Sequence, residues 1–105
     1  MEDVFFQLLL SLGFNPKHKG FLYVTEGLIY YVNQTNISFG EIYQHIANKH
    51  GISKQTVMKC MKNAIDGAIM RRFCDEMQFM QNEDSGSVSV SRFISYYGDT
   101  YKNFS

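Results

Sequence analysis

Apolar side chains recur every three or four residues along much of the chain, and this spacing predicts amphipathic helices. The first stretch runs from Val4 to Leu12 and is followed by Gly13, a residue that commonly stops a helix. The second runs from Phe21 to Asn33 and is the most aromatic segment. Because a helix that is apolar on more than one side is normally central, we expect this segment to be the core helix. Its predicted inner positions are Phe21, Leu22, Leu28, Ile29 and Val32, widened by Tyr23, Tyr30 and Tyr31.

The stretch from Phe39 to Arg72 predicts two helices joined by a tight turn around Gly51. A glycine permits the positive φ that ends a helix, and Ser53 is a natural N-cap for the next one. Ser38 and Glu41 have the spacing of a capping box before the first helix. The predicted inner positions are Ile42, Ile46 and Ala47, then Val57, Met61, Ala64, Ile65 and Ala68. The spacing of Ala47, Gly51 and Val57 is typical of a helix-turn-helix.

The remaining segments are connections and shorter elements. Lys17 to Gly20 is a small basic loop that either touches a DNA backbone or is simply exposed. Phe73 to Met80 predicts a short helix, and Ser87 to Val90 a brief extended piece. The last helix is expected from about Ser91, its cap, to Lys102. A glycine at position 98 should weaken that helix by about 1 kcal/mol relative to alanine.

The whole pattern predicts one all-α domain over residues 1–105, a compact bundle of about five to six helices with the helix-turn-helix at about 39–72. With 45% apolar residues, the chain is long enough to bury a core without staples. Two cysteines are too few for a disulfide framework, which favours the reduced cytoplasm. The apolar run from Val4 to Leu12 is too short to span a bilayer, so no membrane association is expected.

The second helix of the pair, about residues 53–70, places a polar strip opposite its apolar stripe. Lysine reaches phosphates, and glutamine, asparagine and lysine reach base edges. This strip predicts a recognition helix that enters the major groove of double-stranded DNA. The predicted contact residues are Ser53, Lys54, Gln55, Thr56, Met58, Lys59, Lys62 and Asn63, with Lys17 and Lys19 from the basic loop.

The formal net charge is 0, whereas nucleic-acid-binding domains are usually basic. The charges are unevenly distributed. Residues 53–72 carry five cations and one acid, a local charge of +4, while residues 73–91 carry four acids and no Lys or Arg, a local charge of −4. The basic segment coincides with the predicted recognition helix, but few phosphates can be neutralised and affinity should be modest. A solvated lysine face on an all-α domain is the alternative.

Nothing in the sequence indicates an enzyme. The histidines His18, His45 and His50 have no metal-ligand spacing with a cysteine or carboxylate, and Cys60 beside the inner stripe is interpreted as a small buried hydrophobe. We therefore expect no catalytic residues, no metal and no cofactor. The tyrosine-rich segment as a stacking platform for single-stranded bases is a further alternative.

The sequence resembles the C-terminal effector domain of the sporulation stage-zero master response regulator of spore-forming bacteria. The residues that carry the resemblance are Leu12-Gly13, Lys19-Gly20-Phe21-Leu22-Tyr23, Glu26, Ile42-Tyr43, Ile46-Ala47, Lys49, Val57, Ala64-Ile65, Ser91, Phe93 and Ile94. The resemblance implies an all-helical transcription factor that binds short promoter boxes, often as tandem copies that suggest a homodimer, and contacts RNA polymerase sigma subunits.

Several positions depart from that family. It carries arginine where this chain has Thr56, Lys59 and Lys62, glutamate at Met58, and histidine at Asn63. Lysine holds phosphate but lacks the guanidinium fork that binds guanine through two bonds. The sequence begins without the family's receiver domain, so a fragment and a freestanding homologue both remain open. These departures favour a second hypothesis, an interaction protein that has lost specific DNA binding and modulates a related regulator or RNA polymerase.

Overall fold

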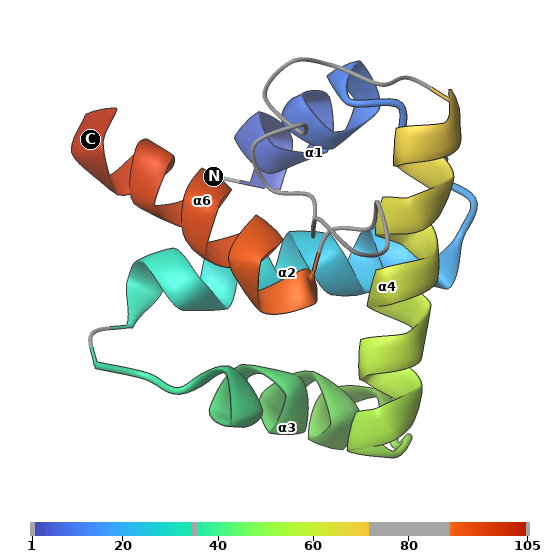
Figure 1. Ribbon diagram of the computed structural model, residues 1–105. Helices are drawn as coiled ribbons and strands as arrows, with labels where there is room; N and C mark the ends of the chain where they lie inside the picture. Colours follow the sequence, from blue (N-terminus) through green and yellow to red (C-terminus); the bar gives the residue numbers. More distant parts are fainter. Residues whose placement is uncertain (1, 35, 72–88, 105) are drawn as a thin grey trace.

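The computed structural model describes residues 2–34, 36–71 and 89–104. Within these ranges the chain forms helices and no strand: α1 (Glu2–Ser11), α2 (Lys19–Asn33), α3 (Phe39–His50), α4 (Lys54–Arg71) and α6 (Val90–Phe104) (Figure 1). The predicted all-α bundle with a helix-turn-helix is confirmed. The predicted short helix over residues 73–80 and residues 87 and 88 of the predicted extended piece lie outside the described residues.

The central helix is α2, as its aromatic pattern predicted. It packs against α1, α3, α4 and α6, and Figure 1 shows it between α1 and α3. One prediction within it was wrong, because Leu22 is 46% exposed whereas Tyr23 is buried. At 100° per residue, the buried Val24 and Leu28 define an inner face from which Leu22 and Glu26 point away.

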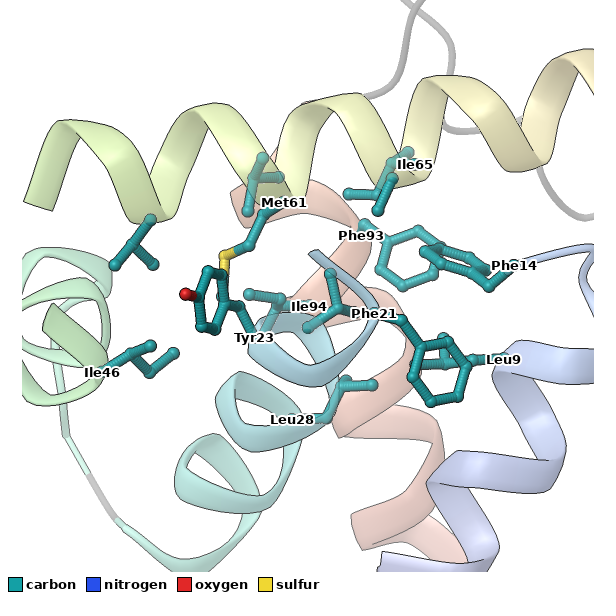
Figure 2. Close-up of a cluster of buried hydrophobic side chains, with 14 of the residues drawn as sticks. Leu9, Phe14, Phe21, Tyr23, Leu28, Ile46, Met61, Ile65, Phe93 and Ile94 are labelled. Atoms are coloured by element: carbon teal, nitrogen blue, oxygen red, sulfur yellow. The ribbon is translucent and has the colours of Figure 1, made fainter. Parts of the chain in front are cut away.

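The core lies where α2 packs against α1, α3, α4 and α6. Figure 2 shows Met61 and Ile65 pointing from α4 toward Tyr23 and Phe93. Burying one side chain of this size stabilises the folded state by roughly 1.5–3 kcal/mol. The row of buried apolar side chains on α4 therefore fixes how this helix is rotated about its axis. All predicted inner residues of α3 and α4 are buried: Ile42, Ile46, Ala47, Val57, Met61, Ala64, Ile65 and Ala68.

Two predicted helix starts need correction. The basic loop is shorter than predicted, because Lys19 and Gly20 already belong to the first turn of α2, after His18. The last helix begins at Val90, and its cap is Ser89 rather than Ser91: the backbone N–H of Arg92 donates to Ser89 Oγ over 3.2 Å. Val90 is therefore helical, and its side chain is buried. Burial of this apolar side chain stabilises the earlier start.

Candidate nucleic-acid interface

The α3–α4 turn is built by local hydrogen bonds. Gly51 has φ 67° and ψ 35°, the left-handed conformation that a glycine adopts without steric cost, and its N–H donates to the Ala47 carbonyl. The N–H of Ile52 donates to the same carbonyl over 3.1 Å. Ser53 Oγ then accepts the N–H of Thr56 over 3.1 Å and caps α4. The predicted turn and its cap are confirmed, and α4 begins at Lys54.

The start of α3 is capped in a similar way. The Oγ of Ser38 accepts the N–H of Glu41 over 3.2 Å, which is the serine half of the predicted capping box. Capped at its first turn and closed by Gly51 at its last, α3 has defined ends. Its buried face holds it against α2 and α4. The helix that precedes α4 is thereby fixed in place.

The outer face of α4 lies opposite its buried stripe. Gln55, Lys59 and Asn63 follow one another at intervals of four residues and are exposed, with no hydrogen bond or ion pair from their side chains to any described residue. Met58 is 40% exposed, on the flank of this face. Side chains at four-residue spacing stand one above the other on a helix. A groove entered by this face would meet an amide, an ammonium group and a second amide in a row.

Two predicted contact residues on α4 have partners within the chain. The hydroxyl groups of Thr56 and Ser53 are hydrogen-bonded over 2.8 Å. Lys62 donates to Asp66 over 3.0 Å, and both of these side chains are partly exposed. A phosphate that binds Lys62 therefore competes with a carboxylate one turn away. Thr56 and Lys62 are therefore more restricted than Gln55, Lys59 and Asn63, whose side chains have no such partner among the described residues.

The other predicted lysines lie around the edges of α4. Lys54 extends toward the first turn of α3, since a Cβ placed on Gly40 would lie 3.1 Å from its Nζ. Lys19, from α2, lines a surface hollow together with His18, Cys60 and Asn63. The structure thus brings Lys19 beside the predicted strip. Lys17 is exposed in the preceding loop.

The approach of α2 to α4 depends on Gly20. A Cβ placed there would overlap the carbonyl oxygen of Cys60 and lie 2.7 Å from the Cβ of Ala64. No larger residue fits unless the helices separate. This contact places the N-terminus of α2, with Lys19, directly against the flank of α4. Cys60, expected to be buried, is only partly so.

Glu26 bonds α2 to the end of α3, a contact that the sequence pattern did not predict. Its carboxylate, 14% exposed, lies 3.0 and 3.1 Å from Nε2 of His50 and 3.3 Å from Nζ of Lys49. These partners form the last turn of α3, directly before Gly51. Burial raises the pKa of the neighbouring Tyr23 phenol, and the charges of Cys60 and Glu26 raise it further. The sequence offered one signal for this contact, namely that Glu26 is the lone acid in an otherwise aromatic helix.

The sequence profile of the family described as "Sporulation initiation factor Spo0A C terminal" matches residues 5–99. The chain belongs to this family. The match extends from α1 into α6 and includes the helix-turn-helix. No curated protein matches the chain significantly.

Membership of the Spo0A C-terminal family indicates the general kind of function. The family is a DNA-binding domain of sporulation initiation, and it is a transcription-factor family rather than an enzyme family. Among the described residues, no group of three His, Cys, Asp or Glu side chains is placed to hold a metal ion. In the same part of the chain, no helix is long and apolar enough to cross a membrane.

Proposed function

We propose that the chain is a sequence-specific transcriptional regulator of the sporulation-initiation type, a single domain that inserts α4 into the major groove of promoter DNA. The observation that carries the proposal is the exposed row of Gln55, Lys59 and Asn63 opposite the buried stripe of α4. Glutamine and asparagine can pair with adenine through two bonds, and lysine with guanine or phosphate. Bound to DNA, the protein would work in the cytoplasm.

The proposed contacts divide into two kinds. Gln55 and Asn63 would face base edges, while Lys59, Lys62 and Lys19 would hold phosphates on either side of the groove. Ser53, Thr56, Lys54 and Lys17 would touch the backbone near the turn and the start of α2. Few cations take part, so binding should weaken with log salt at a slope of about −3 to −5.

Fluorescence anisotropy with a promoter duplex and a scrambled duplex, each at two salt concentrations, tests this function. Lys59→Ala and Lys62→Ala should weaken binding to both duplexes. Gln55→Ala should change the preference between them by about 1–3 kcal/mol. Lys102→Ala is the matched control, since it removes one positive charge from the last turn of α6 and should leave binding unchanged. Absence of any binding at about 50 mM salt would contradict the proposal.

A second candidate is an interaction protein that keeps the family fold without specific DNA binding. The bonds from Thr56 to Ser53 and from Lys62 to Asp66, together with zero net charge, support it. Its partner would be a related regulator, met at that regulator's dimer surface, or an RNA polymerase subunit. The polymerase subunit would bind the acidic 75–84 segment, which lies outside the described residues. Under the first function, by contrast, the proposed protein partner is a second copy of the chain, bound beside the first on tandem promoter boxes. Equal affinity for promoter and scrambled duplexes would favour the second candidate.

A further inference from the structure

Met58 is an apolar side chain exposed on a polar helix face. Among the residues whose burial the structure describes, five large apolar side chains are exposed, and Met58 is the one that belongs to α4. It comes three residues after Gln55 and four before Lys62, so these side chains are neighbours on the helix surface. With Tyr43, Lys59 and Lys62 it also lines a surface hollow at the start of α6.

The major groove gives such a side chain one suitable partner. Base-pair edges there present hydrogen-bond donors and acceptors, apart from the C5-methyl group of thymine, which is apolar. A thioether is at best a weak acceptor, so against any other base edge Met58 would displace water without replacing its hydrogen bonds. Gln55, one turn earlier, carries the amide that suits adenine, the partner of thymine.

We propose that Met58 is a specificity-determining residue that packs on the C5-methyl group of a thymine, in a duplex with an A·T pair beneath the first half of α4. The inference rests on the proposed function, because it requires α4 to lie in the groove. The lysines beside Met58 hold the phosphates, so at this point of the groove the choice of base falls to Met58 and Gln55, while Asn63 faces base edges two turns further along α4. The ligand class is therefore a duplex that presents a thymine methyl group at this point.

The test uses a duplex that the wild-type chain selects from a random-sequence pool, with each thymine replaced in turn by deoxyuridine. Deoxyuridine keeps every hydrogen-bonding group of thymine and lacks only the methyl group. Wild-type binding should weaken by about threefold to tenfold at one position, the effect of burying about one methyl group. Met58→Ala should bind thymine and uracil duplexes equally, and Met58→Leu should retain the discrimination.

Two further variants keep the test sharp. Met58→Gln, of similar length but polar at its end, should also lose the discrimination. Leu22→Ala truncates a comparably exposed apolar side chain on α2 and should keep it. Circular-dichroism melting checks that each variant is folded.

The outcomes separate the inference from the function. If the wild type prefers its selected duplex over a scrambled one and no deoxyuridine changes its affinity, the assignment of Met58 is wrong while the DNA-binding function stands. Persistence of the discrimination in both Met58→Ala and Met58→Gln overturns the assignment as well. If the wild type does not distinguish the two duplexes, the proposed function fails, and the inference fails with it.

Discussion

Gly98 of α6 lies directly against the ring of Tyr31 on α2. A Cβ placed on Gly98 would be 2.7 Å from Cε1 of that ring, closer than real Cβ contacts come. The same ring is held on two further sides. The hydroxyl of Tyr31 donates to Asp99 over 2.7 Å, and Nζ of Lys102 lies 4.4 Å from the ring centroid. The second half of α6 is therefore fitted around one aromatic side chain of the central helix.

Gly98→Ala should destabilise the protein. Helix propensity alone predicts a gain of about 1 kcal/mol from this change, whereas forcing a methyl group into a filled contact typically costs about 1–3 kcal/mol. We expect the packing cost to exceed the gain, and the free energy of unfolding in urea to fall. Gly40→Ala is the control, because its nearest neighbour is the flexible end of Lys54 and the same change should be neutral or stabilising. Equal effects at both sites would contradict the packing argument.

The bond between Tyr31 and Asp99 should make stability depend on alkaline pH. This hydrogen bond, burial and the carboxylate charge raise the pKa of Tyr31 from its ordinary value of 10.0 to about 12. The folded state therefore holds the Tyr31 proton more tightly than the unfolded chain does. The contribution of this bond to the free energy of unfolding is complete below pH 10 and is lost as the pH rises through 12. In urea unfolding, the wild type should have a larger free energy of unfolding than Tyr31→Phe at pH 8. The difference between the two proteins should shrink toward pH 12. A constant difference across that range would refute the linkage.

The sequence predicted the structure best where a local feature, such as helical periodicity or a cap, decides it without help from distant residues. Periodicity located the buried stripe of α4, and the cap at Ser53 and the turn at Gly51 follow from hydrogen bonding and φ within a few residues. Gly98 shows where such reasoning ends. Its propensity cost was evident from the sequence, but its contact with Tyr31, 67 positions away, depends on how two helices cross. The start of α6 shifted to Val90 for the same reason, since tertiary burial of one side chain decided it.

The candidate interface was predictable as a set of residues but not as a set of bonds. Exposure of Gln55, Lys59 and Asn63 follows from rotation about the helix axis. The pair of Lys62 with Asp66 depends on the rotamers of two flexible side chains. Glu26 stood out as an isolated acid and as one residue of the family resemblance, but its bonds were not predictable, because its partners at the end of α3 are distant in sequence.

Glu26→Gln should weaken the contact between α2 and the last turn of α3, and so destabilise the protein. The carboxylate is mostly buried and bonds His50 through both oxygens, and hydrogen bonds to charged groups contribute about 1.5–3 kcal/mol. We expect the free energy of unfolding to fall by about 1–3 kcal/mol in urea titration. Lys49→Ala removes the other partner, which is 57% exposed, and should cost less than about 1 kcal/mol. A larger loss in Lys49→Ala than in Glu26→Gln would reverse this order of importance.

Asp66→Asn should strengthen DNA binding without a large change in stability. Asp66 forms a partly exposed ion pair with Lys62 one turn earlier, and such pairs contribute only about 0.2–0.5 kcal/mol on a helix. Its carboxylate both competes for the ammonium group and repels a phosphate brought to this face. Removing that charge should raise the affinity for a promoter duplex by about threefold to tenfold, and steepen the slope against log salt by up to about one unit. Anisotropy titrations at two salt concentrations measure both effects.

Asp99→Asn on α6 is the matched control, since it also removes one acid and should leave the salt dependence unchanged. If Asp66→Asn and Asp99→Asn raise affinity equally, the effect belongs to net charge rather than to the Lys62 pair.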